Sequence, residues 1–161
     1  MTEKYQPKGK WRTKLEKQQE PKVVDVPDQW KAKYGEGQML IPRPLDVDAL
    51  IRKIPKGKLV TQAQLRDKLA MDAGIDSCCP ITTGIFVRIS AEAAEEDRSE
   101  GVSKITPWWR VVTPKGELNP KFPGGALLQA KLLENEGHTI ELIKGKKLLR
   151  VKNFDKRLVK L

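Results

Sequence analysis

The chain has 161 residues, of which 39% are hydrophobic, and it contains no apolar run long enough to cross a bilayer. This length suits one domain with a real core plus extensions. The formal net charge of +10 favours a polyanionic partner, most simply nucleic acid. On charge alone, a basic protein without such a partner is the alternative. An anionic membrane surface fits less well, because no strongly amphipathic basic helix is present.

The first residues and the cysteines bear on the cellular compartment. Residues 1–10 are polar and lack the apolar stretch of a signal peptide. Cys78 and Cys79, the two cysteines, are adjacent, so an ordinary disulfide between them is not expected. These features predict a protein of the reducing cytoplasm. Neither a membrane, a metal nor another cofactor is predicted as a partner.

Residues 1–38 are predicted to form a basic, largely disordered extension, because they offer few apolar side chains for burial. Trp11 and Trp30 interrupt the polar pattern and are candidates to dock on the domain. The domain itself is predicted over residues 39–152, followed by a basic tail at 153–161. The basic residues in the first part of the extension are Lys4, Lys8, Lys10, Arg12, Lys14 and Lys17.

Two helices are predicted in the first part of the domain. The first has Asp46 as its N-cap and runs through Ile51, and residues 55–57 end it. A short strand at 58–60 leads to Thr61, which is predicted to cap the second helix.

A third helix is predicted to begin at Pro80, a favourable first helical residue. Ile81, Ile85 and Ile89 recur at four-residue spacing, so this apolar stripe is predicted to face the core. The other side of the helix is then the available surface. It carries Thr83, Gly84, Val87 and Arg88.

The rest of the chain completes an α+β pattern. Two helices followed by a hairpin around residues 113–116 have the outline of a winged helix. A helix is predicted over 125–136, with Gly137 as its C-cap. Residues 139–151 alternate in polarity and turn at 144–146, which predicts a second hairpin. The predicted fold is therefore a winged-helix-like α+β domain with flexible basic extensions.

An acidic stretch separates Arg88 from Trp108. It would repel a phosphate backbone, so it is predicted to point away from nucleic acid or to gate access to it. Its acidic residues are Glu92, Glu95, Glu96, Asp97 and Glu100.

Four short segments carry a family resemblance. The run Thr106-Pro107-Trp108-Trp109-Arg110-Val111-Val112 is followed by Gly124-Gly125 and then by Glu136-Gly137, and Ile54-Pro55-Lys56-Gly57-Lys58-Leu59-Val60-Thr61 precedes them. At this spacing they resemble the DNA-binding domain of the O6-alkylguanine-DNA alkyltransferases, whose pattern is Pro-Cys-His-Arg-Val. The match covers roughly residues 46–137. It is closest to the alkyltransferase-like proteins, which carry tryptophan in place of the acceptor cysteine.

The resemblance places Trp108 at the acceptor position and Trp109 at the histidine position. Alkyl acceptance needs a thiolate, and an indole N–H donates but cannot take a proton. The chain is therefore predicted not to be an enzyme. Trp108 is interpreted as a pocket wall for a flipped base, with core packing as the alternative for both tryptophans.

Glu136 and Arg110 match charged positions of the family pattern, and Lys121 lies on the loop beside the pocket. Glu136 shares the apolar face of its helix and needs a donor, for which Trp109 and Arg110 are candidates; its role is structural in either a buried or a surface setting. Arg110 is predicted to brace its loop, or else to meet phosphate. Lys121 is a candidate phosphate contact, with a solvated lysine as the alternative.

The resemblance implies two sets of residues. The base-pocket set is Gln62, Pro107, Trp108, Trp109, Arg110, Val111, Phe122, Pro123 and Gly124. The DNA-binding set is Thr61, Thr82, Thr83, Gly84, Val87, Arg88 and Lys121. The family's tyrosine falls on Gln62, its arginine finger on Ile81, and an amide N–H of its pocket on Pro123, which has none. The resemblance thus supports the scaffold and DNA binding better than a particular lesion.

The leading hypothesis is a monomeric, non-catalytic protein that binds double-stranded DNA through the minor groove and senses alkylated or flipped bases, with repair proteins as further partners. One alternative is an active enzyme that uses Cys78 or Cys79 as a relocated acceptor, since both lie at a helix start where the dipole lowers a thiol pKa. Buried, idle thiols are the competing interpretation. The other alternative is an RNA- or ribosome-binding module on the same scaffold.

Overall fold

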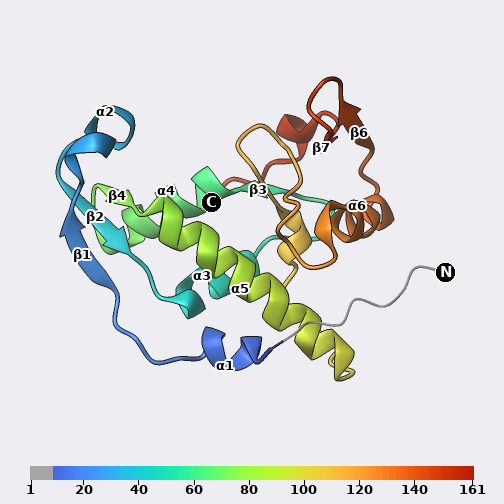
Figure 1. The fold of residues 1–161 in the computed structure, drawn as a ribbon, viewed down its shortest axis with the longest axis horizontal. Helices are drawn as coiled ribbons and strands as arrows, with labels where there is room; N and C mark the ends of the chain where they lie inside the picture. Colours follow the sequence, from blue (N-terminus) through green and yellow to red (C-terminus); the bar gives the residue numbers. More distant parts are fainter. Residues whose placement is uncertain (1–8) are drawn as a thin grey trace.

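The structure is a computed structural model that describes residues 9–161. Its central element is the long helix α5, Pro80–Ser99, which runs diagonally across the molecule in Figure 1. The remaining α-helices are α1 Trp11–Leu15, α2 Lys31–Tyr34, α3 Pro44–Ile51, α4 Gln62–Ala73 and α6 Gly125–Asn135. The 3-10 helices are η1 Asp28–Trp30, η2 Trp108–Arg110 and η3 Phe154–Arg157.

Short strands form small separate sheets among these helices. They are β1 Lys22–Asp25, β2 Gln38–Ile41, β3 Val60–Thr61, β4 Ser77–Cys78, β5 Val111–Val112, β6 Ile140–Ile143 and β7 Leu148–Val151. β2 lies between β1, its antiparallel partner, and β4, its parallel partner. β3 pairs in parallel with β5, and β6 pairs with β7 as an antiparallel hairpin. The α+β class predicted from the sequence is confirmed.

The hydrophobic core has two main parts. Ile51, Leu65 and Val87, from α3, α4 and α5, are fully buried in the first part. Leu133 of α6 and Val151 of β7 belong to the second part. Trp109 packs against both parts, so the loop that carries the paired tryptophans lies at their junction.

Local sequence signals explain where several elements begin. Thr61 caps α4 as predicted: its hydroxyl accepts from the Gln64 backbone N–H, and the Gln64 side chain accepts from the Thr61 N–H in return. The predicted helix over 125–136 and the predicted hairpin over 139–151 are present as α6 and β6–β7. α3 starts earlier than predicted, because Pro44 occupies its first turn and Asp46 pairs with Arg43 instead of capping.

The turn predicted around residues 113–116 is also present. The Gly116 N–H donates to the Thr113 carbonyl at 2.8 Å. After the turn, Leu118 N–H donates to the carbonyl of Leu149 at 2.9 Å, so the returning chain joins the β6–β7 hairpin. Within residues 9–161, every helix is too short or too polar to span a membrane.

The N-terminal segment differs from the disordered extension that was predicted. From residue 9 onward it forms α1, β1, η1 and α2, and Leu15 is fully buried. Residues 11 and 12 dock on α5, and β1 adds an outer strand beside β2 (Figure 1). The segment is therefore part of the domain, and its docking supplies the burial that its composition lacks locally. Lys4 and Lys8 lie outside the described residues.

The C-terminal segment is also attached rather than a free basic tail. The Leu59 N–H donates to the Arg157 carbonyl, and the Val159 N–H donates to the Leu59 carbonyl, both at 2.9 Å. The Gln64 side chain donates to the Val159 carbonyl at 2.7 Å. These bonds fasten residues 157–159 to Leu59, just before β3, and to the start of α4.

Candidate nucleic-acid interface

Trp108 opens η2 and lies in the core rather than in the wall of an open pocket. Its side chain is fully buried, and its ring contacts Trp109 and Phe122 edge-on, at centroid distances of 6.0 and 5.6 Å. Its indole Nε1 donates to the Glu95 carboxylate at 2.9 Å. The prediction of an accessible stacking surface on Trp108 is therefore wrong for this structure, because no face of the ring is open.

Glu95 is the partner of Trp108 that the sequence did not reveal. Only 3% of Glu95 is exposed, and it also accepts from Arg98 Nε at 3.0 Å, so its buried charge is paired. The acidic stretch was predicted to face away from nucleic acid or to act as a gate. Much of it is the second half of α5, where Glu95 accepts from a side chain and Glu96 accepts from backbone N–H groups of the same protein.

Glu136 is a structural carboxylate, as predicted. It accepts from Trp109 Nε1 at 2.9 Å, from Arg110 Nη2 at 2.7 Å and from the Gly57 N–H at 3.2 Å. Arg110 also donates to the Ile54 carbonyl, which confirms that it braces the loop. Burial alone would raise the pKa of Glu136, but the hydrogen bonds from Arg110, Trp109 and Gly57 outweigh it and hold that pKa below its usual value.

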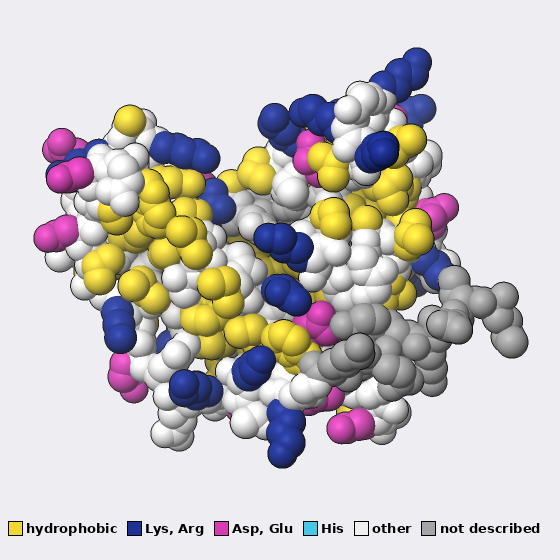
Figure 2. Space-filling view, in the orientation of Figure 1, with side chains coloured by type: hydrophobic (Ala, Val, Ile, Leu, Met, Phe, Trp, Pro, Cys, Tyr) yellow, Lys and Arg dark blue, Asp and Glu magenta, His cyan; other side chains and the backbone are white. Residues whose placement is uncertain are grey.

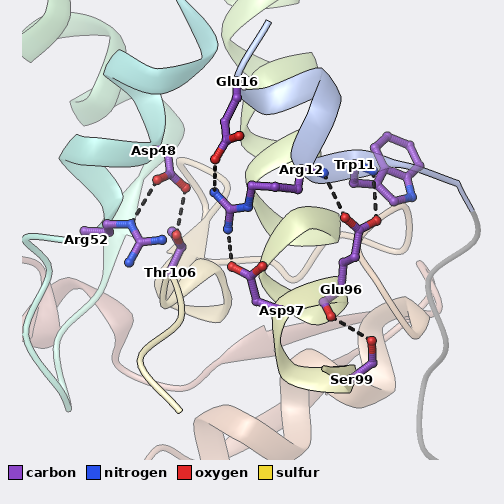
Figure 3. A network of polar contacts seen from close by, with 9 residues as sticks. All are labelled: Trp11, Arg12, Glu16, Asp48, Arg52, Glu96, Asp97, Ser99 and Thr106. Atoms are coloured by element: carbon purple, nitrogen blue, oxygen red, sulfur yellow. Dashed lines mark hydrogen bonds and ion pairs between the residues drawn. The ribbon is translucent and has the colours of Figure 1, made fainter. Parts of the chain in front are cut away.

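The other end of the tryptophan loop is anchored to α3. Thr106 donates its hydroxyl to Asp48 Oδ1 at 2.7 Å, and Asp48 also pairs with Arg52 (Figure 3). Both Thr106 and Asp48 are buried. The loop is thus held on both sides of Trp108, at Thr106 and at Arg110.

The two cysteines do not behave as exposed acceptors. Cys78 and Cys79 are 3% and 7% exposed. Burial raises the pKa of Cys78, so its thiolate is a minor form at neutral pH. Cys79 caps α5, with its sulfur accepting from the Thr82 N–H at 3.5 Å and from the Thr82 hydroxyl at 3.2 Å. The structure therefore gives no support to a relocated acceptor.

The face that α5 exposes is not the one predicted. Ile81 and Ile85 are 58% and 53% exposed, whereas Thr83 and Val87 are fully buried. Small residues make the buried stripe possible, because Ala91 and Ala94 continue it and allow α3 to approach closely. The Thr83 hydroxyl is satisfied within the helix, donating to the Cys79 carbonyl at 2.7 Å. Ile81, Gly84, Ile85 and Arg88 are consequently the residues of the exposed face, and Thr83 and Val87 are removed from the DNA-binding set.

The other predicted contacts fall into accessible and covered groups. Thr61 is buried and committed to its cap, whereas Lys121 is exposed. Gln62 lies beside the exposed face, since its Oε1 would be 3.8 Å from a Cβ added to Gly84. Among the predicted pocket residues, those with buried side chains are Pro107, Trp108, Val111, Phe122 and Pro123. Those with accessible surface are Gln62, Trp109, Arg110 and Gly124.

Figure 2 shows how these chemical types gather on one face of the molecule. Hydrophobic side chains cover its left part, over the region where β1, β2 and the start of α5 lie in Figure 1. Lysine and arginine side chains gather around the β6–β7 hairpin. Residues 9–161 contain no cluster of histidine, cysteine and carboxylate side chains able to hold a metal ion.

The N-terminal contacts are a second feature that the sequence did not reveal. The backbone N–H groups of Trp11 and Arg12 donate to the Glu96 carboxylate at 2.9 and 3.1 Å, and the Arg12 guanidinium pairs with Asp97 (Figure 3). Arg88 lies 5.8 Å from the centre of the Trp11 ring. One signal for the Arg12 contact was the excess of carboxylates over cations in the second half of the third helix.

Comparison with known proteins gives a structural match. No family model matches the sequence, and no curated protein matches it. Among solved structures, the chain is similar to S. pombe Atl1, an alkyltransferase-like protein crystallised in complex with damaged DNA containing O6-carboxymethylguanine. The match has a TM-score of 0.51 and 18% sequence identity, and it covers 73% of this chain and 94% of that chain. This chain therefore has the alkyltransferase-like fold.

Proposed function

We propose that this chain binds duplex DNA through the minor groove and detects altered bases without changing them chemically. One observation above all supports the proposal: the chain shares its fold with S. pombe Atl1, whose crystal structure contains damaged DNA. The net charge of +10 is in keeping with such a partner.

The first half of α5 is the proposed reading element. It carries no carboxylate from Pro80 to Ala91, so nothing on it repels a phosphate backbone. Gly84 leaves room for close approach, and Arg88 supplies a cation on the same exposed face. The exposed Ile81 and Ile85 are of the type that minor-groove proteins insert between base steps.

The proposed mode is binding without alkyl transfer. Tryptophans stand at the two positions where the family needs a nucleophile and a base, and both cysteines are buried. An extruded base would first meet the accessible residues Gln62, Trp109 and Gly124. Contact with Trp108 would require the loop around Phe122 to move, because that ring packs on the indole.

A three-way titration tests this function. The ligands are an undamaged duplex, the same duplex with one O6-alkylguanine, and a structured RNA of equal length. We expect both duplexes to bind with a salt slope of about −0.9 for each phosphate neutralised, the alkylated duplex to bind more tightly, and RNA to bind more weakly. A preference for RNA would favour the alternative of an RNA-binding module.

Mass spectrometry after incubation with the alkylated duplex tests the absence of chemistry. We expect the protein mass to remain unchanged, because the thiols of Cys78 and Cys79 are both buried. A stoichiometric gain of one alkyl group on Cys78 or Cys79 would establish an enzyme instead.

A further inference from the structure

A small basic pocket lies away from α5, where the end of α6 meets β7 and η3. Its volume is about 200 Å³, below the roughly 300–1,000 Å³ of sites for drug-sized ligands. It is therefore suited to a small group. Its lining is made by residues 137–139, 152–153 and 156–157.

The charges on this lining are all positive. Lys152, Lys156 and Arg157 line the pocket, and no carboxylate does. None of the three cations forms an ion pair within the part of the chain that the structure describes. Asp155 lies on the same 3-10 turn but is not part of the lining. Three unpaired cations around one small pocket favour an anionic ligand.

His138 gives the pocket a polar group that lacks a partner. The side chain is buried, with 7% of the residue exposed, and its Nε2 has no hydrogen-bond partner among residues 9–161. The end of α6 fixes its position, because the His138 N–H donates to the Leu133 carbonyl at 3.1 Å. Unsatisfied buried polar atoms are uncommon in folded proteins and call for a ligand or another explanation.

The backbone around the cations is also fixed. The Lys152 N–H donates to the Thr139 carbonyl at 2.8 Å, and the Lys156 N–H donates to the Asn153 carbonyl at 3.1 Å. Asn153 has a φ of 56°, in the left-handed region, where it begins the turn that carries Lys156 and Arg157. The pocket is thus formed by hydrogen-bonded backbone rather than by a chance meeting of long side chains.

We propose that this pocket binds a phosphate group, either as a free phosphate ion or as part of a nucleic-acid backbone. The proposal stands independently of DNA reading by α5. Lys152, Lys156 and Arg157 supply charge-assisted hydrogen bonds to the phosphate oxygens. Protonation of the His138 imidazole would add a fourth positive charge to the lining of the pocket.

His138 is also a specific reporter, because it is the single histidine of the chain. Burial and the nearby Arg157 and Arg110 lower its pKa, while Glu136 acts in the opposite direction. A bound phosphate would favour the charged imidazolium, so the pKa of His138 should rise on binding.

Nuclear magnetic resonance of the full chain labelled at histidine tests the proposal. Inorganic phosphate is titrated at constant ionic strength set with chloride, and an undamaged DNA duplex is titrated separately in phosphate-free buffer. We expect saturable shifts of the His138 ring signals with inorganic phosphate, with the duplex, or with both. The midpoint of the His138 pH titration should be higher with the bound ligand than without it. A response to phosphate alone assigns a free-ion site, and a response to the duplex assigns a backbone contact.

Matched charge variants separate the pocket from general attraction. In the double variant Lys156→Gln with Arg157→Gln, the dissociation constant for the responding ligand should rise about tenfold or more. The double variant Lys144→Gln with Lys146→Gln removes the same charge at the β6–β7 turn and should weaken binding far less, by the loss of general attraction alone. Absence of any His138 response, or equal weakening by both double variants, would overturn the proposal.

Discussion

The two halves of α5 differ in chemistry and in what they contact. The first half exposes Ile81, Ile85 and Arg88 and has no carboxylate. The second half is acidic, but Glu95 accepts from the buried Trp108, and Glu96 accepts from the backbone of residues 11 and 12. One helix therefore serves as a surface at one end and as an internal scaffold at the other. The charge of a sequence segment therefore does not by itself show whether its side chains face solvent or other parts of the protein.

The largest expected effect comes from the tryptophan held by the second half of α5. Trp108→Ala should lower the free energy of unfolding by about 3–5 kcal/mol, because it empties a fully buried site. It also leaves Glu95 without its indole donor. Urea denaturation measures the loss. A loss below about 1 kcal/mol, the size of an ordinary substitution, would contradict a core position for this ring.

Docking of the N-terminal segment gives the next effect. Leu15→Ala should cost about 2–5 kcal/mol, because Leu15 is fully buried against the domain. The matched control is Leu127→Ala on α6, where the side chain is 76% exposed and the change should stay within about 0.5 kcal/mol. Equally negligible changes in the free energy of unfolding at both positions would support the disordered extension that the composition predicted.

Glu136 gives a smaller effect with a defined pH dependence. Its pKa is lower in the folded protein than the unfolded value of about 4.3, so its stabilising contribution is complete above that value and disappears as the pH falls through the folded pKa. Glu136→Gln should cost about 1.5–3 kcal/mol at pH 7, the range of hydrogen bonds to charged groups. Denaturation curves from pH 7 to pH 3 should show a shallower decline for the variant. If the free energy of unfolding fell equally with pH in the variant and the parent, Glu136 would not be the group that causes the decline.

Local chemistry made part of this account predictable from the sequence. Thr61 before a helical run was predicted to cap that helix, and Glu136 on an apolar helix face demanded donors, for which Trp109 and Arg110 were the candidates. Each of these predictions depended on one polar group that has few ways to be satisfied. The structure confirms them for that reason.

Long-range packing made the rest unpredictable. The isoleucine stripe of α5 indicated a buried face, but the helix buries Thr83, Ala91 and Ala94, because small side chains allow tight contact with α3. Similarly, nothing local to Glu96 indicates that its partners are the N–H groups of residues 11 and 12. The first is an error that came from treating apolar residues as buried, and the second is a contact between segments about 85 residues apart that no local pattern indicates.

The central claim is that duplex DNA binds at the exposed first half of α5. Gly84→Glu and Gly84→Gln place side chains of nearly equal size on that face, where an added Cβ meets no atom closer than 3.8 Å. Both should fold, with a modest gain from replacing a helical glycine. Fluorescence anisotropy with an undamaged duplex should show binding at least about tenfold weaker for the glutamate than for the glutamine, because only glutamate repels phosphate. Equal affinities in the two folded variants would contradict the claim that this face meets DNA.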